Sequence, residues 1–107
     1  MKVLLDECVT KRLKPYLKDF EVYTVFEMRW SGVKNGKLLS LCVMNRFDIL
    51  LTIDKNMMYQ QNLEKYPISI VVLNVFTSKL EELILFMPSL SKQIYQFEKH
   101  KSYLIEK

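Results

Sequence analysis

The sequence predicts an α/β fold, namely a doubly wound parallel sheet with helices on both faces, in three layers. Apolar segments of strand length alternate with segments of helical periodicity along the chain. The strand-like segments are apolar on both of their faces, which is typical of strands inside a parallel sheet. Right-handed crossovers then favour the strand order 2-1-3-4, with a short edge strand expected near the C-terminus.

Length and composition narrow the class of protein. The 107 residues are half apolar and include only two glycines and three prolines, with no linker-like tract, so a single domain over residues 1–107 is expected. No apolar run reaches the roughly 18 residues that cross a bilayer, and no signal peptide is recognisable. We therefore expect a cytoplasmic protein with no membrane partner. The net charge of +4 permits an anionic partner without proving one.

The first half of the chain alternates short strands with helices. The expected elements are a strand at 2–5, a helix at 11–18, a strand at 21–25, a helix opening at 35 or 36, and a strand at 48–53. Thr10 can cap the first of these helices, and Pro15 lies early in it, where a missing N–H group costs little. The segment 21–25 is β-branched and aromatic, which favours a strand.

The second half continues the same alternation. A short helix is expected within 57–65 and should end before Pro67, and the run 68–73 is the most strand-like in the chain. Ser78 is the expected cap of a longer helix whose first turn carries two glutamates. Pro88 should kink or divide that helix. The segment 102–105 is expected to form the edge strand.

Carboxylates follow two of the expected strands at the end where parallel sheets bind ligands. Asp6 follows the first strand and Asp54 follows the third, so they should face each other where the strand order reverses. Like charges this close favour a cation between them, and hard oxygen ligands suit Mg²⁺ or Mn²⁺. Such an ion can activate water and stabilise charge on a phosphodiester. The alternative is that both residues only cap turns. His100 is the only histidine, which excludes most sites built on histidine.

Three segments of the chain carry a family resemblance. They are Leu4-Leu5-Asp6-Glu7, the stretch 27–39 with Trp-Ser-Gly-Val-Lys-Asn-Gly at 30–36, and the stretch 47–56 with Thr-Ile-Asp-Lys-Asn at 52–56, followed by Tyr-Gln-Gln-Asn-Leu at 59–63. In order and spacing these segments resemble the short PIN-like proteins, small relatives of the PIN-domain ribonucleases that include VapC-type toxins. The resemblance covers residues 2 to about 73, with a looser match through the last helix.

The resemblance implies a PIN-like fold and hydrolysis of RNA with Mg²⁺ or Mn²⁺. Asp6, Glu27 and Asp54 match the family's catalytic and metal-binding acids. Asn35 stands where many relatives carry a further acid, and its amide can ligate a metal ion through oxygen but brings no negative charge. Asn56 likewise stands where some relatives have an aspartate. A small antitoxin protein is the partner that the resemblance implies, and a second copy of the chain is a further candidate.

Polar residues around Asp54 are candidates for contacting RNA. The candidate substrate-binding residues are Thr52, Lys55, Asn56, Tyr59 and Gln60. Thr52 lies two residues before Asp54 on the same face of the strand, and the polar run 59–62 is either an RNA contact or the solvated side of a helix. Glu7 is a further candidate, although the alternation of side chains along an extended segment would turn it away from Asp6.

Three functions compete on this sequence. The first is a metal-dependent endoribonuclease of toxin type. The second is a catalytically weakened PIN-like module that binds RNA or protein, which Asn35 and Asn56 favour. The third is a receiver-like domain with Asp54 as phosphate acceptor, because receivers also place an acidic pair after the first strand and an aspartate after the third. Receivers carry a Lys-Pro pair after their fifth strand, and this sequence has none beyond Pro67.

Overall fold

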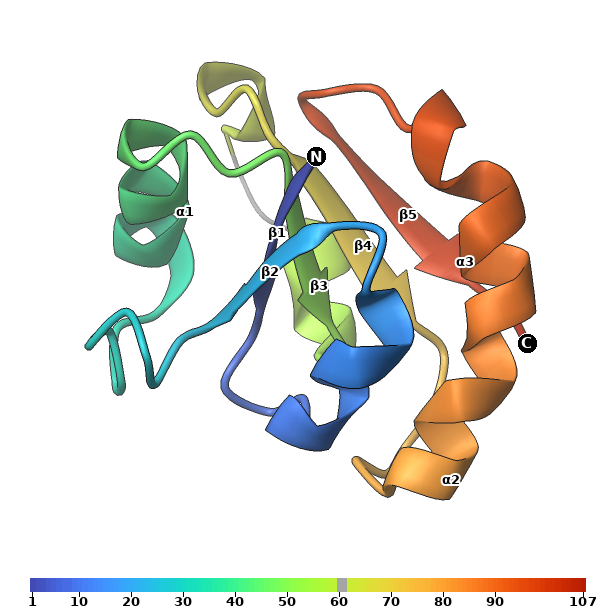
Figure 1. Ribbon diagram of the computed structural model, residues 1–107. Helices are drawn as coiled ribbons and strands as arrows, with labels where there is room; N and C mark the ends of the chain where they lie inside the picture. Colours follow the sequence, from blue (N-terminus) through green and yellow to red (C-terminus); the bar gives the residue numbers. More distant parts are fainter. Residues whose placement is uncertain (60–61) are drawn as a thin grey trace.

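The computed structural model describes residues 1–59 and 62–107, except for the side chain of Asn35, and shows an α/β architecture (Figure 1). In this described part, five parallel strands form one sheet in the order β2-β1-β3-β4-β5. The strands are β1 (Lys2–Leu5), β2 (Glu21–Thr24), β3 (Ile49–Thr52), β4 (Ser69–Leu73) and β5 (Lys101–Ile105). The predicted order 2-1-3-4 and the C-terminal edge strand are confirmed, and the edge strand starts one residue earlier than predicted.

Helices connect successive strands. The 3-10 helix η1 (Lys11–Leu17) follows β1, the α-helix α1 (Asn35–Met44) follows β2, and the 3-10 helices η2 (Lys55–Tyr59) and η3 (Leu63–Lys65) follow β3. A longer helical segment precedes β5 and consists of α2 (Leu80–Leu83), η4 (Ile84–Phe86), α3 (Met87–Gln93) and η5 (Ile94–Gln96). Within the described ranges, no helix is long and apolar enough to cross a membrane.

The helices cover both faces of the sheet, as expected for strands that are apolar throughout. Val3 and Leu5 of β1 point into a core with η1 and the segment 80–96, whereas Leu4 points to the opposite face, against α1 and η2. Figure 1 shows these two layers on either side of the strands. Burial on both faces explains why β3 and β4 contain only buried side chains.

Local chemistry agrees with most of the predicted helix boundaries. Thr10 caps η1, since its Oγ1 accepts a hydrogen bond from the backbone N–H of Arg12 at 3.3 Å, although the helix is of the 3-10 type. Pro88 lies in the first turn of α3 and marks the division of the segment 80–96, as predicted. The predicted Ser78 cap is wrong. The helix begins at Leu80, and the N–H of Lys79 is bound instead by Oγ1 of Thr77 at 3.2 Å.

Candidate functional site

The candidate site lies beyond the carboxyl ends of β1 and β3. These strands are hydrogen-bonded neighbours, and β2 pairs with the other edge of β1, so the strand order reverses here. Asp6 follows β1 directly, and Asp54 follows β3 after one intervening residue. Both line the same cavity, which has a volume of about 430 Å³. The two aspartates therefore line one crevice at the carboxyl end of the sheet.

A buried hydroxyl links the two aspartates. Thr52 is fully buried, and its Oγ1 donates a hydrogen bond to Oδ2 of Asp6 at 2.7 Å. The same oxygen accepts the backbone N–H of Asp54 at 3.0 Å. The other carboxylate oxygen of Asp6, Oδ1, accepts the N–H of Glu7 at 2.8 Å. Because both oxygens of Asp6 are held, the carboxylate is fixed in orientation. Oδ1 accepts this one hydrogen bond and keeps a lone pair for a ligand.

Glu7 also belongs to this cavity. Its side chain lines the cavity, and its Oε1 accepts the backbone N–H of Gly32 at 3.1 Å. Gly32 has a φ of +84°, a backbone conformation that favours glycine. Strand alternation does not decide the direction of Glu7, because the chain leaves the extended conformation directly after Asp6. The contact with Gly32 ties the loop before α1 to the rim of the cavity.

A thiol and a cation complete the polar lining. Sγ of Cys8 lies 3.7 Å from Oδ2 of Asp6 and 3.4 Å from Oγ1 of Thr52. Lys34 lines the cavity at the N-terminus of α1, where the helix dipole adds a partial positive charge. The apolar part of the wall comes from Val33, Leu38, Ile53 and Met57. Sequence reasoning missed Lys34, although its position just before the Asn-Gly pair that opens α1 was a usable signal.

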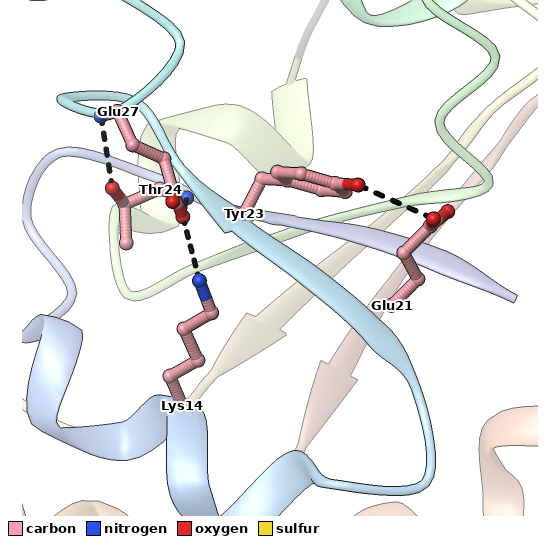
Figure 2. A network of polar contacts seen from close by, with 5 residues as sticks. All are labelled: Lys14, Glu21, Tyr23, Thr24 and Glu27. Carbon is pink, nitrogen blue, oxygen red and sulfur yellow. Dashed lines mark hydrogen bonds and ion pairs between the residues drawn. The ribbon is translucent and has the colours of Figure 1, made fainter.

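Glu27 lines a different hollow. Figure 2 shows its contacts with Thr24 and Lys14. Its Oε1 accepts the N–H of Thr24 at 2.7 Å, and its own N–H donates to Oγ1 of Thr24 at 3.1 Å, which is the reciprocal pattern of a capping box. The same Oε1 binds Nζ of Lys14 at 2.9 Å, and this charged hydrogen bond holds the pKa of Glu27 below its usual value. Glu27 is thus not among the residues that line the cavity of Asp6 and Asp54.

The predicted metal-binding set is only partly assembled. Over residues 1–59 and 62–107 there is no group of three or more His, Cys, Asp or Glu side chains placed to hold a metal ion. Glu27 pairs with Lys14, and the side chain of Asn35 lies outside what the structure describes. Mg²⁺ needs fewer protein ligands than this, because it keeps several waters and binds through one or two carboxylates together with substrate phosphates. Asp6 and Asp54 fit that donor set.

The other predicted substrate-binding residues lie along the segment after Asp54. Nζ of Lys55 donates to the backbone oxygen of Val75 at 2.7 Å, so this lysine reaches towards the loop after β4. The backbone N–H of Asn56 binds Oδ1 of Asp54 at 3.0 Å, which closes a turn of the kind that aspartates favour. Tyr59 is 81% exposed. Gln60 lies outside the described residues.

Comparisons with known proteins do not identify a relative of this chain. No protein-family model, no curated protein and no solved structure matches the chain. The resemblance to PIN-like proteins therefore stays a prediction from the sequence motifs. The geometry of Asp6, Thr52 and Asp54 is the basis for the functional proposal below.

Proposed function

We propose that the protein is a PIN-like endoribonuclease of toxin type that depends on Mg²⁺ or Mn²⁺ and acts in the cytoplasm. One observation carries the proposal. Asp6 and Asp54 line one cavity at the point where the strand order reverses, and the buried hydroxyl of Thr52 connects them. Motifs of the sequence supply the family, and a small antitoxin protein is the partner that we propose to block the site.

In this proposal, the residues of the cavity have different roles in phosphodiester hydrolysis. Asp6 and Asp54 would hold the metal ion, which when bound neutralises charge on the phosphate and activates water. Thr52 keeps Asp6 in a single orientation, so that little reorganisation is needed for binding. Lys34 lines the same cavity, and its positive charge would attract the phosphate group of the substrate. Glu7 is the remaining carboxylate among the residues that line the cavity, and in this proposal it would accept a proton from the attacking water.

The proposal is tested by Asp54→Asn, which removes a negative charge while keeping the shape of the side chain. We expect the rate of cleavage of a single-stranded RNA in Mg²⁺ or Mn²⁺ to fall by more than about a hundredfold. The added thermal stability that either ion confers on the wild-type protein should also be lost, because a ligand that binds only the folded state raises its stability.

Asp19→Asn is the matched control. Asp19 is an exposed aspartate that precedes β2. It therefore lies at the amino end of the strands, whereas the cavity lies at their carboxyl end. The same chemical change there should leave cleavage and ion-dependent stabilisation as in the wild type. Unchanged cleavage by the Asp54→Asn protein, with the fold intact by circular dichroism, would contradict the proposal.

A catalytically weakened RNA-binding module is the second candidate. It is favoured by Glu27, whose carboxylate is engaged by Lys14 and Thr24 rather than placed in the cavity of Asp6. This function predicts RNA binding of equal strength in EDTA and in Mg²⁺, with no cleavage in Mg²⁺ or Mn²⁺. Cleavage that disappears in the Asp54→Asn protein would exclude it.

A further inference from the structure

Two phenylalanine side chains project into solvent on either side of the acidic cavity. Phe26 is 81% exposed and follows β2, and Phe76 is 93% exposed and follows β4. Because all strands are parallel and ordered β2-β1-β3-β4, the residues after these strands follow one another along a single edge of the sheet in the order Phe26, Asp6, Asp54 and Phe76. Figure 1 shows the four connecting segments along the lower edge of the strands.

Phe26 is continuous with the cavity on one side. It lines a hollow of about 330 Å³ together with Asp6 and Glu7. A further hollow of about 390 Å³ joins the same ring to Lys11 and Arg12 at the start of η1. An exposed ring between an acidic cavity and two cations combines the stacking and charge features of surfaces that bind single-stranded nucleic acid.

Phe76 is connected to the cavity on the other side through Lys55. Nζ of Lys55 lies 4.1 Å from the centroid of the Phe76 ring and donates to the backbone oxygen of the preceding residue, Val75. Lys55 is itself next to Asp54 in the chain. The loop is also held at its base, because the N–H of Asn74 donates to the backbone oxygen of Ile105 at 2.9 Å. The Phe76 ring is therefore held against Lys55, the residue that follows Asp54 in the chain, and is still exposed.

The packing of the two cores does not explain why these two rings are phenylalanine. A phenyl ring left in water forfeits the stabilisation that burial would supply, and neither ring is among the residues that pack into the two cores. Trp30, by contrast, contacts the ring of Phe47 with centroids 5.9 Å apart and belongs to a core. Trp30 is thus used for packing, whereas Phe26 and Phe76 remain exposed.

We propose that Phe26 and Phe76 are base-stacking platforms that flank the scissile phosphate and restrict the substrate to single-stranded RNA. The inference deepens the proposed function and rests on it. Three strand spacings separate β2 from β4, or about 14 Å, which a short run of nucleotides spans. Bases of a single strand can turn onto the rings, whereas bases of a duplex stay stacked on each other. Every base has a π-face, so the platforms give strand selectivity without sequence selectivity.

The test measures binding under conditions in which cleavage cannot occur. The probe is a fluorescein-labelled single-stranded RNA of about ten nucleotides and mixed sequence, long enough to cover both rings, in EDTA. We expect Phe26→Ala and Phe76→Ala each to raise the Kd about tenfold, and the double variant about a hundredfold. Phe26→Tyr and Phe76→Tyr keep a ring and should bind within about twofold of the wild type.

Tyr95→Ala is the control for loss of an exposed ring. Tyr95 is 71% exposed in η5, at the amino end of β5 and away from the cavity, and its removal should leave the Kd unchanged. Equal affinity of the alanine variants and the wild type, or equal affinity of the wild type for the single strand and its duplex, would overturn the inference. Ring-dependent binding without any cleavage in Mg²⁺ or Mn²⁺ would support the platforms and refute the nuclease.

Discussion

The two cysteines of the chain are set apart by their surroundings. Cys8 is exposed and lies beside Asp6 in the cavity, whereas Cys42 is buried in the core between α1 and the sheet. Burial raises the pKa of the Cys42 thiol to about 12, and the charge of Asp6 adds to the effect. A buried thiol that stays protonated is a poor nucleophile. Reactivity should therefore be confined to Cys8.

A thiol reagent should accordingly label one cysteine of the folded protein. We expect iodoacetamide to add to Cys8 and not to Cys42, because Cys8 is exposed, whereas Cys42 is buried and its raised pKa keeps the thiol protonated. Peptide mass spectrometry of the labelled protein locates the adduct. The Cys8→Ser protein should remain unlabelled until it is denatured. Labelling of Cys42 under native conditions would contradict the structure of this core.

The titration of Glu27 is the second prediction about a single side chain. The hydrogen bond from Lys14 lowers its pKa below the usual 4.5, and Lys14→Met should bring the pKa back towards that value. A lowered pKa means that the pair stabilises the fold above pH 4.5 and that this contribution disappears as the pH falls through the folded-state pKa. The contribution is small because both side chains are more than a third exposed. NMR titration of the Glu27 carboxyl measures the shift directly.

The helix α1 ends in a turn in which Arg46 adopts a left-handed conformation that is unfavourable for a residue with a side chain. The N–H of Phe47 donates to the oxygen of Cys42, and the N–H of Arg46 donates to the oxygen of Val43, which together form a Schellman motif. Arg46 occupies the left-handed position of this motif with a φ of 63°, where glycine is usual. Burial of Phe47 against Cys42 in the core holds the turn in place.

Arg46→Gly should stabilise the protein. Removing the side chain relieves the cost of the left-handed conformation, about 1–2 kcal/mol, and this gain is partly offset by the larger entropy of glycine in the unfolded chain. We expect the free energy of unfolding to rise by about 0.5–1 kcal/mol, measured by urea denaturation. Lys37→Gly, at an exposed position inside the same helix, should lower it by about 1 kcal/mol. A loss of stability in Arg46→Gly would contradict the strain.

Helix ends were the least accurate part of the sequence interpretation. Serine and threonine both commonly cap helices, but α2 has no side-chain cap. The hydroxyl that binds the backbone just before it is that of Thr77, which accepts the N–H of Lys79. The choice between adjacent hydroxyls depends on where the chain leaves β4, and no local pattern reports this. The division of the segment at Pro88 was predictable because proline lacks the N–H group that an uninterrupted helix requires.

Over the whole molecule, positive charge is in excess but the cavity is acidic. The chain carries a net charge of +4, while Asp6, Glu7 and Asp54 gather at one edge of the sheet. Lys11 and Arg12 lie in the adjoining hollows. A nuclease needs such a combination, because the cations attract the phosphate backbone while the carboxylates bind the metal ion.

Salt dependence tests this charge distribution. The logarithm of the association constant for single-stranded RNA should fall linearly with the logarithm of salt concentration. Replacing Lys11 and Arg12 together by glutamine should reduce the slope by about 1.4, since each single-strand phosphate contact contributes about 0.7. Replacing Lys18 and Lys92, which lie away from the hollows, should leave the slope unchanged. Equal slopes in all three proteins would show that η1 does not contact the RNA.

The amino-acid pattern was sufficient for the parallel sheet, its order and the placement of Asp6 and Asp54 at the same end of it. Strand burial on both faces and right-handed crossovers dominate the energy of such a fold, and both are visible as apolar runs and their spacing. The loops required the tertiary structure. Individual contacts between distant segments decide the pairing of Glu27 with Lys14 and of Glu7 with Gly32. They also decide that Phe26 and Phe76 stay exposed. Such contacts are weak compared with core burial, so they leave no periodic signal in the sequence.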